Sequence, residues 1–351
     1  MKQNRRQFLT GFAGLAALSL ADLRTAAANE LSGNRHSPIQ VILPRAFPAG
    51  ADFQSEPYKA RLTRAVLETL QHFYSQEPMP VWEQPFGKVD MEVRIRNIIF
   101  WLTEGVRRAA KTYPLDPAWM MAQMMKESYF YEFAVSRALA VGICQFIQGT
   151  AEEYEMLCGG TRPEHTRPPY RETELAGAAE EYYRLRRERR NYQRKARPAE
   201  TFTLDKALDI IINKPSKAER QAAEKFVLYR EQIDTYHRQE REAMENFRQY
   251  LRANVEGRSI FRQQDLDFIL GFDERFTYKK PAFGMCLMMA RALRSRNGNI
   301  LAATISYNAG LSSTRASGRY EPYGRIPDIE QSTTYLSHVM INHHEIVKRM
   351  A

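Results

Sequence analysis

The sequence contains little cysteine, which excludes a fold held together by many disulfides. Three cysteines occur among 351 residues, at Cys144, Cys158 and Cys286, whereas small secreted domains that depend on disulfides carry them densely. An odd number also leaves at least one thiol without a partner inside the chain. Two interpretations of Cys144 stay open: a small buried hydrophobic residue, or one half of a disulfide with Cys158.

Metal-ligand spacing, strand patterns and internal repeats are also missing. The seven histidines show no ligand spacing with acids or cysteines, so no metal and no cofactor is predicted, and His343 and His344 are expected on an exposed helical face. No stretch alternates apolar and polar residues between turn signals, which argues against a sheet. With 44% apolar and 26% charged residues, the composition is that of a globular protein. A mainly α-helical globular protein is therefore predicted.

The N-terminus lacks an apolar run long enough to span a membrane stably, but it has the features of an export signal. Arg5 and Arg6 precede a moderately apolar run over residues 8–20, and small residues follow at 26–28. The arginine pair is similar to a twin-arginine signal. An ordinary secretory signal and an uncleaved anchor are the alternatives. The mature chain is expected to start near Asn29, in the periplasm, with no stable transmembrane segment.

The charge of the chain is basic. The formal net charge is +10, and removing the predicted signal leaves 47 basic and 40 acidic residues, a net charge of about +7. A basic exported protein could meet nucleic acid, an anionic membrane or an anionic wall polymer. Because the signal directs the chain out of the cytoplasm, the wall polymer is favoured and no nucleic-acid partner is predicted.

Helical periodicity and capping signals account for most of the chain. Asp116 and Pro117 open an apolar helix, because aspartate is a good N-cap and proline is tolerated at the first helical position. Ser216 followed by Glu219 is a capping box that opens a long helix. Besides the long helix that begins at Ser216, helices are expected over about residues 57–75, 90–112, 117–130 (the helix that Pro117 opens), 260–271, 281–296, 299–307 and 331–349.

Glu127 stands at the end of the apolar helix predicted from Pro117. A carboxyl in such surroundings is poorly solvated, which disfavours its charged form and raises its pKa. A glutamate that stays protonated near neutral pH can donate its proton to the leaving oxygen of a glycosidic bond. Most glutamates near helix ends are solvated or paired, so this feature alone does not identify a catalytic acid.

Two blocks of the sequence resemble the lytic transglycosylase family, which has a goose-type-lysozyme-like fold and cleaves peptidoglycan. The first block runs from Asp116-Pro117 through Glu127-Ser128 and the stretch 140–145 to Thr150-Ala151. Within it, Leu139 stands where the family usually has glycine. The resemblance covers roughly residues 112–158 and 260–349.

The second block contains two shorter motifs. Residues 305–310 read Ile-Ser-Tyr-Asn-Ala-Gly and resemble the family's Ala-Tyr-Asn-Ala-Gly motif. Gln331-Ser332-x-x-Tyr335 resembles its closing Glu-Thr-x-x-Tyr motif. Both motifs follow the first block in the order that the family shows.

The resemblance implies a role for five residues. Glu127 would be the catalytic acid, and Ser136 would lie beside the N-acetyl group of the substrate. Gln145 would line the sugar groove, Tyr307 would pack beside the catalytic glutamate, and Asn308 would be its neighbour. Each of three has a structural alternative: Ser136 could cap the next turn, Gln145 could satisfy buried backbone groups, and Tyr307 could serve packing alone. No metal is implied.

The function implied by the resemblance is that of an exported peptidoglycan lytic transglycosylase. Glu127 would act as the single general acid and base on the β-1,4 bond between N-acetylmuramic acid and N-acetylglucosamine, with a 1,6-anhydromuramoyl product. The partner would be the glycan strand. Two alternatives remain: a hydrolytic muramidase, and a non-catalytic peptidoglycan-binding assembly factor of an envelope-spanning machine.

The predicted fold is mainly α, a lysozyme-like helical domain with a long charged helical insertion. The insertion is explained either by a helical hairpin that buries its aromatic stripe against the domain or by a surface that docks a protein partner or an anionic polymer, as the cluster from Arg184 to Arg190 suggests. Six parts are expected: an export signal (1–28), a linker or extended arm (29–56), N-terminal helices packing on the catalytic domain (57–112), the first half of the transglycosylase domain (113–170), the insertion (171–255), and the second half of the domain (256–351).

Overall fold

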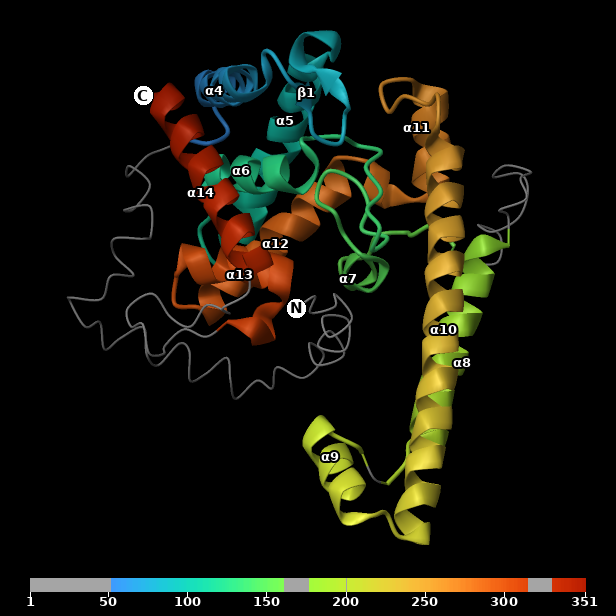
Figure 1. The fold of residues 1–351 in the computed structure, drawn as a ribbon. Coiled ribbons are helices and arrows are strands. Elements are labelled where there is room, and N and C mark those ends of the chain that lie inside the picture. Colours follow the sequence, from blue (N-terminus) through green and yellow to red (C-terminus); the bar gives the residue numbers. More distant parts are fainter. Residues whose placement is uncertain (1–51, 161–176, 200, 315–329) are drawn as a thin grey trace, which may run out of the picture. The chain divides into compact units, whose positions relative to one another are not determined.

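The computed structural model of the protein describes residues 52–160, 177–199, 201–314 and 330–351, and this part of the chain is mainly α-helical, as predicted (Figure 1). The predicted export signal and most of the predicted arm lie outside the described residues. Within the described ranges, no helix has the length and apolarity needed to cross a bilayer.

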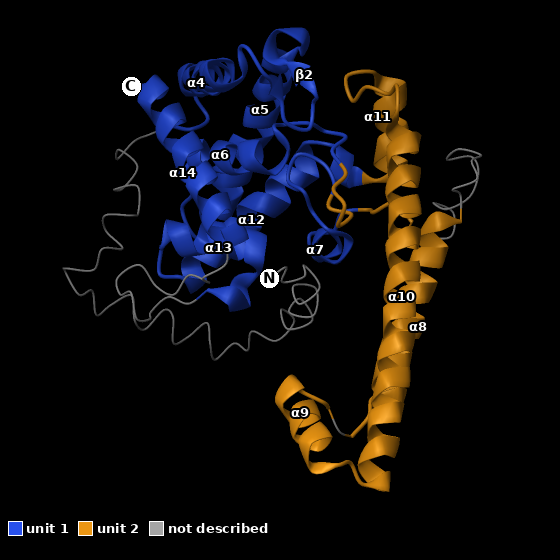
Figure 2. Cartoon of the chain, in the orientation of Figure 1, with its two compact units in different colours: residues 1–134, 141–156, 274–351 blue, residues 135–140, 157–273 orange. Residues whose placement is uncertain are grey.

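The chain divides into two compact units (Figure 2). Unit 1 contains residues 1–134, 141–156 and 274–351, and unit 2 contains residues 135–140 and 157–273. Unit 2 therefore includes the predicted insertion together with residues on both sides of it.

Unit 1 is a cluster of helices with one short hairpin. Helix α5 packs against α12 and α4, and α14 packs against α6 and α4. The helices are α4 (Glu56–Tyr74), α5 (Met91–Ala109), α6 (Pro117–Ser128), α7 (Gln148–Glu153), α12 (Lys279–Ser295), α13 (Ile300–Ala309) and α14 (Glu330–Met350). The shorter elements are the paired strands β1 (Pro78–Met79) and β2 (Gln84–Pro85) and the 3₁₀ turns η2 (Phe86–Lys88), η4 (Glu274–Phe276) and η5 (Leu311–Ser313).

Helix α6 is buried on nearly all sides, as its composition predicted. Trp119 and four methionines of this helix are at most 1% exposed, and the indole Nε1 of Trp119 donates a hydrogen bond to Thr304 Oγ1 of α13 at 3.0 Å. Flexible methionine side chains fill irregular space between neighbouring helices. The core of unit 1 therefore surrounds the helix that carries Glu127.

Unit 2 is built around a long helical hairpin. Helix α8 (Ala178–Ala196) pairs with α10 (Lys217–Val255), and the unit also contains α9 (Leu204–Asn213) and α11 (Gln263–Phe272). The predicted capping box is present: Ser216 Oγ accepts from the backbone N–H of Glu219, whose carboxylate accepts from the backbone N–H of Ser216. This reciprocal cap fixes where the 39-residue helix begins.

The aromatic stripe of α10 packs mainly against α8, so the hairpin supplies its own core. Tyr192 stacks on Tyr229 with ring centroids 5.8 Å apart, and Tyr182 lies 5.9 Å from Phe247. At the same interface Arg189 forms an ion pair with Glu240 of α10 at 2.5 Å. A helical hairpin is present as predicted, but its stripe packs against α8, whereas the prediction had the stripe packing against the domain.

All three cysteines are buried, and none of them forms a disulfide. The disulfide between Cys144 and Cys158 is therefore wrong, and the interpretation of Cys144 as a small buried hydrophobic residue is confirmed. Burial raises the pKa of the Cys144 thiol well above its usual value, so the thiol stays protonated.

Candidate active site

Helix α6 is fixed at its beginning by Asp116. One carboxylate oxygen accepts a hydrogen bond from the backbone N–H of Ala118 at 2.8 Å, and Pro117 occupies the first helical position. The second oxygen lies 2.7 Å from Nε2 of His343 on α14. The N-cap of α6 is therefore also a contact between α6 and α14.

The end of α6 turns sharply just after Glu127. Tyr129 and Phe130 have φ values of 52° and 63°, in the left-handed region. The backbone N–H of Tyr129 donates a hydrogen bond to the carbonyl of Met125 at 3.0 Å. Trp82 holds this turn, because its Nε1 donates to the carbonyl of Tyr129 at 2.8 Å. The chain thus leaves the helix immediately beyond the catalytic candidate.

Tyr335 of α14 orients the Glu127 carboxyl. Its hydroxyl donates a hydrogen bond to Glu127 Oε1 and accepts one from Nε2 of Gln123, one helical turn before Glu127. Tyr335 is only 5% exposed. A carboxyl held by such a buried chain of hydrogen bonds has one defined direction.

Burial raises the pKa of Glu127 from 4.5 to about 7, against the opposing effects of the Tyr335 hydrogen bond and the nearby charge of Lys126. The side chain nevertheless keeps a partly exposed edge. The carboxyl is therefore available in both its protonated and its ionised form near neutral pH, and its proton can be reached from outside. The direction of the shift is the one expected from the apolar helix.

The segment after α6 folds back over the end of that helix. Ser128 Oγ donates to the carbonyl of Ile143 at 2.9 Å, and the Tyr307 hydroxyl donates to the carbonyl of Cys144 at 2.6 Å. An antiparallel bridge between Val141 and Phe146 closes the loop. The two motifs that lie far apart in the sequence thus meet at this loop.

Gly142 has a structural role in the loop. Its φ is 77°, and a Cβ at this position would lie 1.8 Å from the carbonyl oxygen of Arg275. The backbone of η4 therefore passes so close to the loop that no side chain fits between them.

The five predicted site residues differ from one another in what they contact. Gln145 turns its amide inward and donates to the carbonyls of Ala134 and Gly142 at 3.3 and 2.9 Å, which fits its backbone-satisfying alternative. Tyr307 binds the loop rather than the carboxyl of Glu127, although the charge of Glu127 contributes to the raised pKa of its phenol, after burial and Cys144.

Ser136 lies in unit 2 and caps a turn. Its Oγ accepts from the backbone N–H groups of Ala138 and Ala140 at 3.3 and 3.0 Å, which fits its capping alternative. In the same turn Leu139, which stands where the family usually has glycine, adopts φ 61° in the left-handed region. A position of Ser136 beside the substrate remains a prediction.

Asn308, in the last turn of α13, has an unsatisfied polar group. Its Oδ1 is buried and has no hydrogen-bond partner among the residues that the structure describes. A buried amide oxygen without a partner is costly, so this atom is available to a ligand or a water molecule.

Two residues of the site were not among the predicted ones. Tyr335 belongs to the closing motif quoted above, so its spacing from Gln331 carried the signal. Gln123 stands four residues before Glu127 on one helical face, but nothing in the sequence shows that it reaches Tyr335.

A second carboxylate, Glu132, follows the turn and is neutralised. It is 1% exposed, and the Arg94 guanidinium contacts both of its oxygens, at 2.9 to 3.2 Å. Arg94 also lies over the ring of Trp82, with its Cζ 5.1 Å from the centroid. Glu132 therefore holds the turn and is not free for chemistry.

Glu132→Gln is expected to destabilise the protein by about 2–4 kcal/mol, because it leaves a half-buried arginine without its counter-charge. Urea unfolding of the variant measures this. Glu92→Gln is the matched control, since Glu92 and its partner Arg96 are 64% and 69% exposed, and such pairs contribute about 0–1 kcal/mol. Equal losses of stability in the two variants would contradict a structural role for Glu132.

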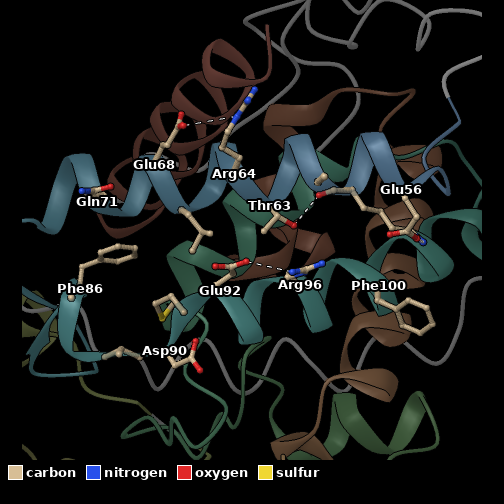
Figure 3. A pocket seen from close by; sticks show the side chains of 16 residues that line it. Glu56, Thr63, Arg64, Glu68, Gln71, Phe86, Asp90, Glu92, Arg96 and Phe100 are labelled. Atoms are coloured by element: carbon tan, nitrogen blue, oxygen red, sulfur yellow. Dashed lines mark hydrogen bonds and ion pairs between the residues drawn. The ribbon is translucent and has the colours of Figure 1, made fainter.

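A cavity of about 720 Å³ lies away from Glu127, between α4, η2 and α5 (Figure 3). Several of its charged lining residues form ion pairs with one another, as in Lys59 with Glu56 at 3.0 Å and Arg96 with Glu92 at 3.4 Å. Among the described residues, no three His, Cys, Asp or Glu side chains gather as a metal site.

Comparison with known proteins adds one finding. Residues 104–179 match the family model described as "Transglycosylase SLT domain". No curated protein and no solved structure matches the chain. The matched segment includes Glu127, Ser136 and Gln145, and it ends before the motifs of α13 and α14.

Proposed function

We propose that the chain, whose residues 104–179 match the family model of the transglycosylase SLT domain, is an exported lytic transglycosylase that cleaves the β-1,4 bond between N-acetylmuramic acid and N-acetylglucosamine in peptidoglycan. The observation that carries this proposal is the state of Glu127. It lies inside the matched segment, is oriented by Tyr335, is partly exposed and has a pKa of about 7.

The proposed mechanism uses Glu127 twice. The protonated carboxyl first donates its proton to the glycosidic oxygen, and the acetamido group of the substrate stabilises the positive charge that develops on the sugar. The ionised carboxylate then takes the proton of the muramoyl C6 hydroxyl, whose oxygen closes a 1,6-anhydro ring. A pKa near the working pH suits a group that must serve as both acid and base, and the Tyr335 hydroxyl stabilises the ionised form between the two steps.

The surroundings of Glu127 support a mechanism with one carboxyl. The groups whose charge or hydrogen bond shifts its pKa are Tyr335 and Lys126, and Glu132 is held by Arg94. A two-carboxylate glycosidase needs a second free carboxyl about 5–9.5 Å away. Asn308, with its buried amide oxygen, Tyr307, Gln145 and Ser136 remain proposed substrate-binding residues.

The product distinguishes this proposal from the hydrolytic muramidase. Purified peptidoglycan would be digested in water enriched in ¹⁸O, and the released muropeptides would be analysed by mass spectrometry. The transglycosylase produces 1,6-anhydro ends without ¹⁸O, because no water is added. Reducing ends that carry ¹⁸O would show a muramidase, and no released muropeptide would favour the non-catalytic assembly factor.

Tyr335→Phe is expected to move the alkaline limb of the pH profile of kcat/KM to higher pH. Cleavage starts from protonated Glu127, so activity falls as the pH rises through its pKa of about 7. The Tyr335 hydrogen bond favours the ionised carboxylate, and removing it raises that pKa further. Tyr74→Phe is the control, because the Tyr74 hydroxyl pairs with Tyr129 and not with Glu127; an unmoved limb in Tyr335→Phe would contradict the assigned contact.

A protein partner bound through residues 171–255 is a further part of the proposal. Helix α9 supports it, since this helix buries no side chain and Leu204, Ile211 and Ile212 are 71–77% exposed. The arginine cluster supports it less, because Arg184 pairs with Glu181 and Glu188 within α8. Deleting residues 171–255 is expected to disturb the localisation of the protein. An unchanged localisation would contradict the proposed protein partner.

A further inference from the structure

Lys126 is a half-buried cation directly before Glu127. Its Nζ lies 2.9 Å from Nδ1 of His338 on α14, and among the described residues it forms no ion pair with a carboxylate. An ammonium group only donates hydrogen bonds, so Nδ1 of His338 accepts, and the imidazole is neutral with its proton on Nε2. Burial lowers the pKa of both groups, and the charge of Lys126 lowers that of His338 further. The pair therefore carries one positive charge.

This pair lies beside the catalytic carboxyl because two neighbouring residues at the end of α6 are bonded to two residues on one face of α14. Lys126 and Glu127 are neighbours at the end of α6. Their partners His338 and Tyr335 stand three residues apart on α14, on one helical face. The charge of Lys126 acts on Glu127 directly, since it lowers the pKa of that carboxyl.

A partly buried ammonium group that is paired only with a neutral imidazole lacks its counter-charge. Of its three N–H donors, one is used by His338. His338 itself is exposed, so its Nε2–H can also donate to a group outside. Two remaining donors of Lys126, the Nε2–H of His338 and one positive charge beside Glu127 suit an anion.

We propose that Lys126 and His338 form a subsite for a carboxylate of the peptidoglycan strand at the bond being cleaved. This inference rests on the proposed function. Muramic acid carries a lactyl carboxylate where the strand is free of peptide, and the peptide supplies carboxylates where it is present. Both sources offer the same chemistry, and a carboxylate bound here by charge-assisted hydrogen bonds would fix the muramoyl residue against Glu127.

The test compares four substrates: peptide-free and peptide-bearing glycan strands, each untreated or with the carboxyls converted to amides. At pH 5.5 Glu127 is protonated in every variant, so changes in its pKa do not affect the comparison. We expect amidation to lower the kcat/KM of the wild type about tenfold or more on the strands whose carboxylate is bound. The type of strand that responds identifies the source of the carboxylate.

Lys126→Met is expected to cleave untreated and amidated strands with equal kcat/KM, whereas Lys126→Arg keeps the preference. Lys111→Met, at an exposed position of the same unit, controls for the loss of one positive charge against an anionic wall. A wild-type preference that persists in Lys126→Met would overturn the subsite. If Lys126→Met fails to fold, Lys126→Gln, which keeps a polar side chain but carries no charge, makes the same comparison.

The outcomes separate this inference from the proposed function. A wild type that cleaves all four strands equally fast overturns the subsite and leaves the transglycosylase intact. A wild type that releases no anhydro product from any strand overturns the proposed function itself.

Discussion

Glu127→Gln is expected to lower the release of anhydro-muropeptides from peptidoglycan by about 10³-fold or more. General acid–base catalysis contributes about 10²–10⁴-fold, and in the proposed mechanism the same carboxyl serves both steps. Glutamine keeps the size of the side chain, and its amide oxygen can still accept the hydrogen bond of Tyr335. Quantitative mass spectrometry of digests measures the loss, with Glu92→Gln as a control at an exposed position.

The same substitution is expected to stabilise the fold at alkaline pH. The folded pKa of Glu127 is about 7, above the ordinary 4.5, so the folded state binds the proton more tightly than the unfolded chain. Stability therefore falls as the pH rises from about 4.5 to about 7, and the full loss is present above pH 7. Glutamine does not ionise, so the variant does not lose this part of the free energy of unfolding.

Urea unfolding at pH 4 and pH 8 measures this effect. Glu127→Gln should be more stable than the wild type by about 1–3 kcal/mol at pH 8, and the difference should vanish at pH 4. An inactive variant that is stabilised at pH 8 and not at pH 4 would identify Glu127 as a desolvated acid. Loss of activity together with loss of stability at both pH values would instead indicate a structural role.

Gly142→Ala is expected to destabilise the protein by about 4 kcal/mol or more, a large part of the roughly 5–15 kcal/mol by which a typical domain is stable. The added Cβ would lie 1.8 Å from the carbonyl oxygen of Arg275 and 2.9 Å from its carbonyl carbon. Backbone cannot rotate away as a flexible side chain can. Arg275 is also held, since it is 1% exposed and its guanidinium donates to the carbonyl of Phe146 at 3.2 Å.

Gly149→Ala is the matched control for Gly142→Ala. Gly149 lies seven residues further on, inside α7, and a Cβ there meets no atom within 4 Å. Alanine in a helix with free space is expected to stabilise by about 0.5–1 kcal/mol. Thermal unfolding of both variants tests the pair, and a melting temperature of Gly142→Ala close to that of the wild type would contradict the close approach of η4.

Local features of the fold could be read from the sequence. Asp116-Pro117 and the capping box at Ser216 and Glu219 mark helix starts through contacts within a few residues, and both are present in the structure. The ends of helices were predicted less well, since α5 stops at Ala109 and α6 at Ser128. At the end of α6, the left-handed turn after Ser128 is in contact with Trp82 and Tyr74, which lie far away in the chain.

The candidate acid could be identified from the sequence, but its surroundings could not. The apolar helix that ends at Glu127 already implies desolvation and a raised pKa, because both follow from neighbours along one helix. The aromatic stripe of α10 likewise indicated a buried face, although periodicity does not show which element covers it. That element is α8.

By itself, the sequence determined a mainly helical chain, the helix that carries Glu127 and the desolvation of that carboxyl, since all three arise from residues a few positions apart. Only the tertiary structure decided that Tyr335 donates to Glu127 across 208 positions, that Glu132 is neutralised by Arg94, and that Gly142 meets the backbone of Arg275. These contacts join helices that are distant in the chain. Their partners depend on how the helices pack, which no local pattern of residues encodes.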